Sequence, residues 1–193
     1  MTKSPKIGSM NRMNRQTFSV AQFGTRLGTR AEGDTARGVL LAAIEAMPPD
    51  GQLLVSLDGI EVLSGSFADE LIAKSYQLLV SGLYADRTMI VGAPSTEVTE
   101  GLDDKLTQRN LAMLCLQNGR SSILGQLADP HRETLSLVID RQSATAKELA
   151  DTLGIPPNAC HQRLRRLVDL RLILQERIGD AAPRTQYRFR SIL

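Results

Sequence analysis

The chain has 193 residues, of which 42% are hydrophobic and 23% are charged, enough for two small cores or one core of ordinary size. The sequence contains no run of about 18 apolar residues and no apolar signal segment, so we expect a cytoplasmic protein that does not contact a membrane. Its net charge of +2 is unevenly divided, because residues 120–193 hold 12 Arg or Lys against 8 Asp or Glu (+4), whereas residues 1–119 hold 11 against 13 (−2).

The first segment, residues 1–16, has no sustained apolar period and carries Lys3, Lys6, Arg12 and Arg15. Such a segment buries too little apolar surface to offset the entropy lost on ordering it. We therefore expect a disordered basic arm. The arm either touches DNA or a partner, or it is an unstructured leader.

Residues 17–118 alternate between strand-like and helix-like segments, which predicts an α/β layer in which helices pack on a small sheet. The expected strands are 17–23, 52–57 and 87–92. The expected helices are 35–47 (capped by Asp34), 66–82 and 97–118.

The stretch LDGIEVLSGSFADEL, residues 57–71, has a strand that ends at Asp58 and a helix that opens at Ser64-Gly65-Ser66. Together with the upstream stretch GTRLGTR (24–30), it resembles the sulphate-transporter and anti-sigma-factor-antagonist (STAS) domain. More closely, it is similar to a STAS-like family of unknown function that carries Ser-Phe-Ala-Asp-Glu. The resemblance covers roughly residues 17–118 and implies an α/β fold without an established activity.

In anti-sigma-factor antagonists a Ser at this helix start is a phosphorylation switch, and the resemblance places Ser66 there. The helix N-terminus would stabilise a phosphate at that position, although Asp69 and Glu70 lie one turn inside and would repel it. The other interpretation, which we favour, is that Ser64 or Ser66 caps the helix with its hydroxyl group.

Arg26 and Arg30 precede this segment and could pair with Asp58, Asp69 or Glu70. Such a cluster would offer a site for an anionic ligand or a protein partner. It could equally be a structural set of exposed ion pairs, each of which contributes only about 0–1 kcal/mol. The sequence leaves both interpretations open.

A linker is expected over residues 119–128, which begin with Gly-Arg-Ser-Ser. Residues 129–193 then predict an α+β domain. Its first helix should span 131–141 behind an Asp129-Pro130 cap, and its hairpin should pair 172–178 with 184–189.

The stretch TAKELADTLGIPPNACHQRLRRLVDLRLIL, residues 145–174, predicts two helices that are separated by Gly154 and Pro156-Pro157. It resembles the helix-turn-helix core of winged-helix regulators of the multiple-antibiotic-resistance and arsenical-resistance repressor types, and the resemblance covers roughly residues 129–193. One departure is Arg171, because those families usually place a Gly there in the left-handed conformation.

The second of these helices has an apolar face and a polar face. In the major groove, Arg can fork onto guanine, and Asn or Gln can pair with adenine; hairpin arginines can reach phosphates or the minor groove. The DNA-binding residues expected on these grounds are Thr145, Asn158, His161, Gln162, Arg163, Arg165, Arg166, Arg177, Arg184 and Arg188.

Enzyme chemistry is not expected, because the sequence has no P-loop, no nucleophile elbow and no zinc-spaced His and Glu pair. Cys160 and His161 point about 100° apart on a helix, so we expect no metal and no cofactor. Cys115 and Cys160 both sit in apolar patterns that look helical, and they are expected to be buried free thiols.

These patterns favour a sequence-specific DNA-binding transcriptional regulator, in which the winged helix reads the major groove of double-stranded DNA and the STAS-like domain senses a ligand or a protein partner. One alternative is an interaction module of a signalling or defence complex, in which the winged helix does not read DNA. Another is an architectural DNA-bound protein without regulatory output. A homodimer is expected, because one winged helix covers only a short site.

Overall fold

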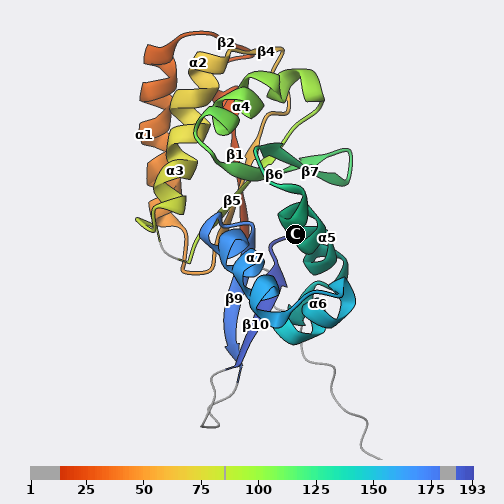
Figure 1. Ribbon diagram of the computed structural model, residues 1–193. Coiled ribbons are helices and arrows are strands. Elements are labelled where there is room, and N and C mark those ends of the chain that lie inside the picture. The colour runs from red at the N-terminus through yellow and green to blue at the C-terminus, as the bar shows by residue number, and fades with distance from the viewer. Residues whose placement is uncertain (1–13, 85, 179–185) are drawn as a thin grey trace, which may run out of the picture.

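The computed structural model describes residues 14–84, 86–178 and 186–193 (Figure 1). The N-terminal half contains β1 (Arg15–Ser19), the 3-10 turn η1 (Val20–Phe23), β2 (Arg26–Leu27), α1 (Arg30–Ala46), β3 (Gln52–Ser56), β4 (Val62–Leu63), α2 (Gly65–Ala68), the π turn η2 (Asp69–Ala73), α3 (Lys74–Val80), β5 (Thr88–Gly92), α4 (Thr96–Gln108), β6 (Ala112–Gln117) and β7 (Arg120–Gly125). The C-terminal half contains α5 (Asp129–Arg141), β8 (Ser143–Thr145), α6 (Ala146–Leu153), α7 (Pro157–Asp169), β9 (Ile173–Ile178) and β10 (Gln186–Ser191).

The N-terminal half is a mixed α/β layer built on a five-stranded sheet of order β1-β3-β5-β6-β7. The first four strands run parallel and β7 runs antiparallel to β6. The side chains of Phe18, Val55, Val91 and Cys115 stand in register across four strands and are buried. Helices α1, α2–α3 and α4 contact one another and cover the sheet (Figure 1).

The beginning of the chain differs from the expected basic arm. Arg15 and Gln16 belong to β1, which pairs with β3, and the Arg15 Nε donates a hydrogen bond to Gln52 Oε1 (2.5 Å). Pairing with the buried strand β3 orders Arg15 and Gln16, which composition alone did not predict. The expected strand 17–23 therefore begins earlier and ends at Ser19, where η1 follows, while Lys3, Lys6 and Arg12 lie outside the described residues.

Helix α1 also begins earlier than expected, because its cap is Thr29 rather than Asp34. The Thr29 side chain accepts a hydrogen bond from the Glu32 backbone N–H, and the Glu32 carboxylate accepts one from the Thr29 N–H (3.0 Å). This reciprocal capping box satisfies two N–H groups that the helix leaves free. Asp34 instead lies within α1 and pairs with Arg37.

The largest correction concerns residues 97–128. The expected helix 97–118 ends at Gln108, and β6 follows it; most of the expected linker 119–128 is β7. Asn110 has a φ of 54° and turns the chain between α4 and β6. Short apolar runs do not distinguish a buried strand from a helix, and here the sheet decides the outcome. Cys115 is thus a buried free thiol, as expected, but it lies on a strand.

Gly125 closes β7 at a position that only glycine fits. Its φ is +82°, and an added Cβ would collide with the Leu111 carbonyl oxygen and lie 2.8 Å from the Leu106 Cβ. The Gly125 N–H donates to Asp103 Oδ1 (2.6 Å). These contacts join the end of β7 to α4 and to the start of β6.

The C-terminal half carries the expected α+β winged helix. Helices α5, α6 and α7 pack on a three-stranded sheet of order β8-β10-β9. Helix α5 begins at Asp129 behind Ala128, so Asp129 is the first helical residue and not the cap. Leu135 and Val138, three residues apart on α5, are buried in the core of this half.

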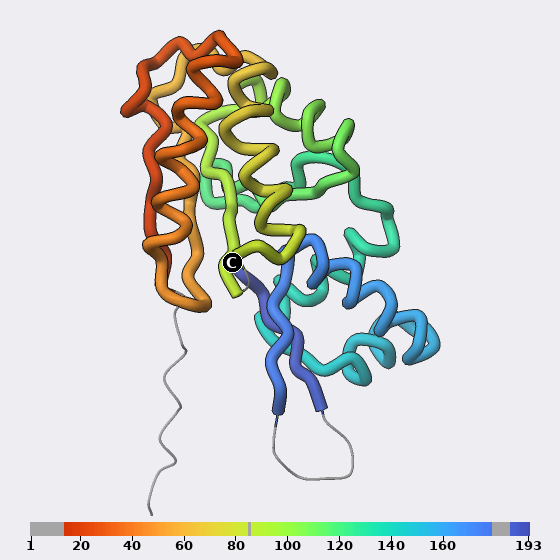
Figure 2. The backbone as a smooth tube through the Cα atoms, turned by 90° about the vertical axis from the view of Figure 1, so that its left-hand side faces the viewer, coloured from red at the N-terminus to blue at the C-terminus, as the bar shows by residue number. Residues whose placement is uncertain are grey.

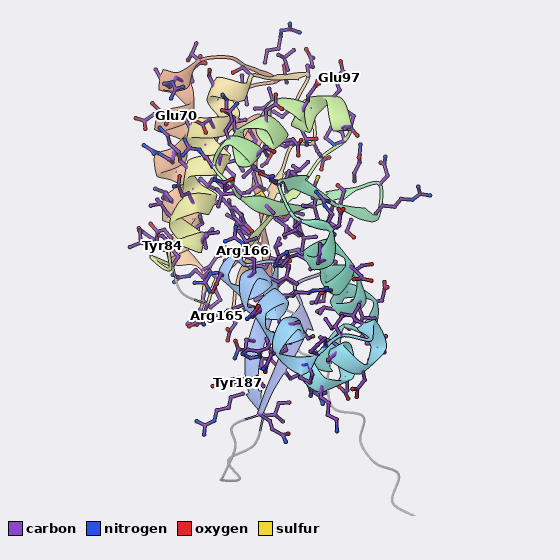
Figure 3. The ribbon with its side chains drawn as sticks, viewed as in Figure 1. Glu70, Tyr84, Glu97, Arg165, Arg166 and Tyr187 are labelled. Carbon is purple, nitrogen blue, oxygen red and sulfur yellow. The ribbon has the colours of Figure 1, made fainter. Side chains whose placement is uncertain are left out.

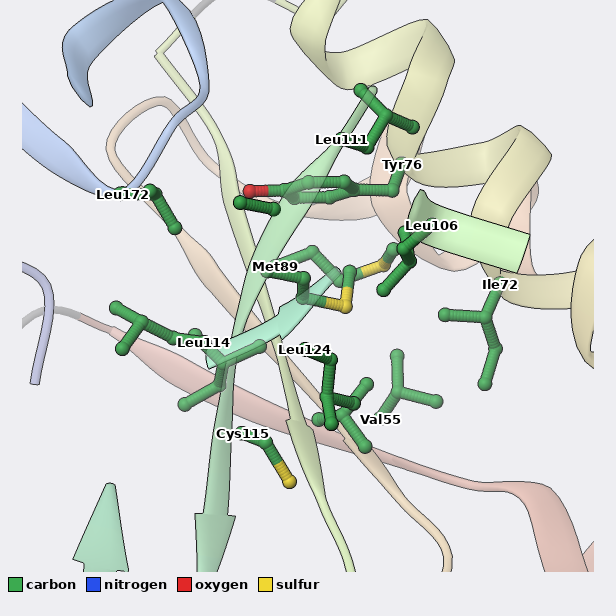
Figure 4. Close-up of a cluster of buried hydrophobic side chains, with 14 of the residues drawn as sticks. Val55, Ile72, Tyr76, Met89, Leu106, Leu111, Leu114, Cys115, Leu124 and Leu172 are labelled. Atoms are coloured by element: carbon green, nitrogen blue, oxygen red, sulfur yellow. The ribbon is translucent and has the colours of Figure 1, made fainter. Parts of the chain in front are cut away.

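The two halves share one hydrophobic core. Leu172, which follows α7, lies with Tyr76, Met89 and Leu114 in a buried cluster (Figure 4). The Tyr76 hydroxyl donates to the Leu170 carbonyl oxygen (2.5 Å). Figure 2 shows the C-terminus beside the strands of the main sheet, where the buried Gln52 Nε2 donates to the Ile192 carbonyl oxygen (2.6 Å).

Candidate nucleic-acid interface

Helix α6 begins with a capping box that fixes the start of the helix-turn-helix. The Thr145 side chain accepts from the Glu148 N–H, and the Glu148 carboxylate accepts from the Thr145 N–H (2.7 Å) and hydroxyl (2.9 Å). These hydrogen bonds hold the pKa of Glu148 below its ordinary value. Gly154, with a φ of 63°, ends α6 in the left-handed conformation that glycine adopts without strain.

Helix α7 is held by one face. Pro157 opens it, and Cys160, Leu164 and Leu167 are fully buried against α5 and α6. Cys160 is a free cysteine that is fully buried and packs in the core, and this burial raises the pKa of its thiol. Arg171 adopts a φ of 59°, which confirms the left-handed exit at this position.

The opposite face of α7 carries an exposed polar stripe formed by Asn158, Gln162 and Arg165. The spacing of four and three residues places the three on one side of the helix. Within the described part of the chain, none of these side chains has a hydrogen-bond or ion-pair partner. The stripe therefore exposes two amide groups and one guanidinium group that are free to bind a partner molecule. Asp169 lies one turn after Arg165 and is also exposed, so a carboxylate stands at the C-terminal end of the stripe. The sequence analysis did not single out this residue.

Arg163 and Arg166 were also expected to bind DNA, but the structure places them beside the polar stripe. The Arg163 side chain is 21% exposed and hydrogen-bonds to Glu133 (3.3 Å) and to the Pro130 carbonyl oxygen (3.4 Å) of α5. Arg166 Nη2 donates to the Asn110 carbonyl oxygen (3.3 Å) in the N-terminal half. Each arginine joins α7 to a neighbouring element.

The wing is the hairpin of β9 and β10, whose two faces differ. Phe189 is buried and meets His161 of α7 edge to face, with ring centroids 6.4 Å apart. Tyr187, two residues nearer the tip, lies on the same face, is 40% exposed and stands opposite Arg177. Arg188 is exposed on the other face, opposite Glu176. Arg184 lies outside the described residues.

A hollow of about 390 Å³ lies between the start of α6, α7 and the wing. Its lining includes Thr145, Lys147, His161, Gln186 and Tyr187. Sequence reasoning did not single out Lys147 and Tyr187, although a lysine in the first turn of a capped helix and an aromatic residue near a hairpin tip were visible signals. Figure 3 shows Arg166, Arg165 and Tyr187 in that order from the α/β half toward the wing.

Ser64, not Ser66, caps the helix of the N-terminal candidate site. Its hydroxyl accepts from the Phe67 N–H (3.1 Å) and donates to the Gly28 carbonyl oxygen (2.6 Å). Ser66 lies within α2 and is half-buried. Capping therefore holds for one of the two expected serines, and phosphorylation of Ser66 stays a prediction.

The expected cluster of arginines and carboxylates is divided. Of the expected pairs, the described residues form one, in which Arg30 Nη1 contacts Glu70 Oε1 (2.7 Å). The other expected members have separate partners, as Arg26 pairs with Glu61, Asp58 accepts from Ser56, and Asp69 pairs with Arg109.

Two carboxylates of this region, Asp69 and Glu70 in η2, are nearly buried and ion-paired. Lys74 and then Arg30 lower the pKa of Glu70, which Figure 3 places on the outer side of the α/β half. The hydrogen bond from Arg109 lowers the pKa of Asp69. These pairs satisfy charges within the fold, and a ligand or partner site at the five candidate residues stays a prediction.

Three helices followed by a β-hairpin, with α7 exposed along one face, define a winged helix-turn-helix domain. Residues 127–173 match the winged helix-turn-helix DNA-binding family. Comparison with curated proteins and with solved structures finds no match.

The described residues contain no group of three or more His, Cys, Asp or Glu that could hold a metal ion. None of the helices described is both long and apolar enough to cross a membrane.

Proposed function

We propose that the chain is a sequence-specific DNA-binding transcriptional regulator whose helix α7 enters the major groove. The observation that carries this proposal is the unpartnered polar stripe of Asn158, Gln162 and Arg165 on a helix that lies within the match to DNA-binding domains. Asn and Gln present the donor and acceptor pair that adenine requires, and Arg presents the fork that guanine accepts. The stripe thus has the chemistry for direct base readout.

We propose that the cationic side chains beside the stripe contact the phosphate backbone of the DNA. Lys147 at the start of α6 and Arg177 on the wing are exposed cations on the side of α7 where His161 meets the wing. Contacts of this kind position a protein on the duplex without reading sequence. Tyr187 adds an exposed ring that can pack on the sugar-phosphate chain.

The role proposed for the N-terminal half is to sense a ligand or a protein partner, as the resemblance to STAS-like domains implies. Helix α3 supplies a route for this regulation, since Tyr76 bonds to the residue that ends α7 and the Leu79 carbonyl accepts from Arg171 Nε (3.3 Å). A second copy of the chain is part of the proposal, because two winged helices would read two half-sites.

Duplex binding under increasing salt tests the proposal. Neutralised phosphates make log K fall linearly with log salt, with a slope of about −0.9 per phosphate contact. We expect the full chain to bind a labelled duplex with such a slope, and Arg177→Ala to reduce the slope by about 0.9. Arg120→Ala is the matched control, because Arg120 is exposed on β7 and should leave the slope unchanged.

A chain that binds no duplex at any salt concentration would refute the proposal. That result would favour the alternative in which the winged helix mediates protein contacts within a signalling or defence complex.

A further inference from the structure

A second hollow lies beside the C-terminal end of α7, at the junction between the two halves. It measures about 330 Å³ and is lined by Asn110, Gln126, Leu127, Ala128, His131 and Arg166. Asn110 precedes β6, Gln126 follows β7, His131 is in the first turn of α5, and Arg166 is in the last turn of α7. Because both halves contribute to it, this junction hollow exists only when they are docked together.

The junction hollow has the lining of an anion site. Arg166 is exposed and is held at its rim by the hydrogen bond to the Asn110 carbonyl oxygen. Asn110 and Gln126 add amide groups, and none of the lining residues is acidic. Glu133, on the same helix as His131, is paired with Arg163. Burial lowers the pKa of His131, and the nearby charges of Arg166 and Arg163 lower it further.

The junction hollow and the wing flank the polar stripe on opposite sides. At 100° per residue, Arg166 lies about 80° from Asn158 in one direction and His161 about 60° in the other. His161 meets the wing through Phe189, whereas Arg166 meets the N-terminal half through Asn110. A duplex that covers the stripe therefore has the wing on one side and the junction hollow on the other.

The length of α7 brings its C-terminal end to a phosphate strand. Thirteen helical residues span about 20 Å, whereas the major groove is about 12 Å wide. When the N-terminal end reaches the base edges, the C-terminal end lies outside the groove, over the backbone that borders it. Arg166 is one turn after Gln162, so that backbone passes the junction hollow.

We propose that the junction hollow binds a phosphate group of the duplex backbone, so that the α/β half takes part directly in DNA binding. Arg166 supplies the charge, and the amides of Asn110 and Gln126 donate hydrogen bonds to the phosphate oxygens. This inference rests on the proposed function, because it requires α7 to occupy the groove. It assigns the N-terminal half a contact with DNA in addition to sensing.

The test compares salt slopes of the full chain and two variants. Arg166→Ala should reduce the slope by about 0.9 and weaken preferred and unrelated duplexes to the same extent. Gln126→Glu places a negative charge in the junction hollow and should weaken both duplexes several-fold. The matched control Gln117→Glu adds the same charge at the far end of β6 and should leave affinity within about twofold. Thermal unfolding checks that each variant is folded.

The outcomes separate this inference from the proposed function. If the wild-type chain binds duplexes but Arg166→Ala and Gln126→Glu keep its affinity and slope, the junction site is wrong and groove reading stands. If the wild-type chain binds no duplex, both fail.

Replacing chloride by inorganic phosphate at constant ionic strength distinguishes DNA phosphate from a free ion. The proposal predicts less than about a twofold change in duplex affinity on this replacement, because many duplex contacts act together. A site for the free anion alone would bind inorganic phosphate in the absence of duplex, while Arg166→Ala left duplex affinity and salt slope unchanged; that result would overturn the proposal.

Discussion

The two ends of α7 have opposite surroundings. At the N-terminal end, Asn158 and Gln162 are exposed and have no partner among the described residues. At the C-terminal end, the Leu170 carbonyl accepts from Tyr76, and Leu172 is completely buried in the core that both halves share. The same helix thus packs into the shared core at its C-terminal end and exposes unpaired polar side chains at its N-terminal end. The α/β half therefore holds α7 directly instead of carrying it on a flexible tether.

Leu172→Ala should have the largest effect, because it removes a buried side chain from the shared core. We expect a loss of about 2–5 kcal/mol in the free energy of unfolding. Urea unfolding should show both halves unfolding in one transition at a lower urea concentration. Leu83→Ala, at a side chain 64% exposed, is the control and should cost less than about 0.5 kcal/mol. Two separate transitions in the wild-type chain would contradict the shared core.

Tyr76→Phe should have the next largest effect, because it leaves the Leu170 carbonyl without its donor in a buried place. The expected cost is about 1–3 kcal/mol in the free energy of unfolding. The matched variant Tyr84→Phe removes a hydroxyl that bonds to Glu45 at the surface (3.0 Å), and it should cost clearly less. Equal losses for the two variants would show that the hydrogen bond from Tyr76 to Leu170 stabilises the fold no more than an exposed hydrogen bond does.

Gln162→Ala tests the free end of the helix, and its effect should fall on binding alone. The preferred duplex should lose about 1–3 kcal/mol of binding free energy, with discrimination relaxed at one base pair. The unfolding midpoint should stay the same, since the side chain has no partner within the fold. Gln16→Ala, on an exposed side chain of β1 that also has no partner among the described residues, is the control for both measurements. A change in stability without a change in specificity would place Gln162 in the fold and not in the interface.

The pH dependence from Asp69 should be the smallest effect. The hydrogen bond from Arg109 holds the pKa of Asp69 below its ordinary value of 3.8 in the folded chain. The folded carboxylate binds a proton less readily than the unfolded one, so its contribution is complete well above pH 3.8. It is lost as the pH falls through 3.8 toward the lower folded value.

Urea unfolding between about pH 6 and pH 3 measures this contribution. Asp69→Asn should be less stable near pH 6 and should lose stability less steeply below about pH 5. Parallel curves for the wild-type chain and the variant would mean that the ion pair does not contribute.

The winged helix could be predicted closely from the sequence because local rules determine it. Thr145 and Glu148 form the capping box that their spacing indicates, Gly154 ends α6, and Pro157 begins α7. Arg171 adopts the left-handed conformation at the position where the families named above usually have a glycine. Each of these features depends on neighbours within four residues, so a single sequence contains the information.

The strand β6 was missed because its parallel partner β5 lies across helix α4 in the sequence. The strand β7 pairs with β6 across the two-residue turn Asn118-Gly119, a hairpin signal that was readable but was taken for the start of a linker. The run AMLCLQ, residues 112–117, begins with four consecutive buried residues, so it lacks the alternation of a half-exposed strand. The capping box of Thr29 and Glu32 was readable, whereas the fit of Gly125 against Leu111 was not. The resemblance of the N-terminal half to STAS-like domains stays a prediction.

The candidate interface was predicted in part. The polar stripe follows from helical periodicity, which also places Arg166 on the outward side of α7, but the contacts of Arg163 and Arg166 with other elements could not be predicted. Their partners, Glu133 and the Asn110 carbonyl, come from other elements, and helical spacing contains no information about them. Tyr187 was missed for the same reason, since its place beside α7 depends on how the wing packs.

Selection of bound duplexes from a random pool tests the central claim most directly. The wild-type chain and a variant that combines Asn158→Ala, Gln162→Ala and Arg165→Ala should be compared at the same salt concentration and with equal unfolding midpoints. The account predicts that the wild-type chain enriches one common sequence and that the variant enriches none. A wild-type chain that enriches no common sequence, or a variant that enriches the same one, would contradict the assignment of α7 as the reading helix.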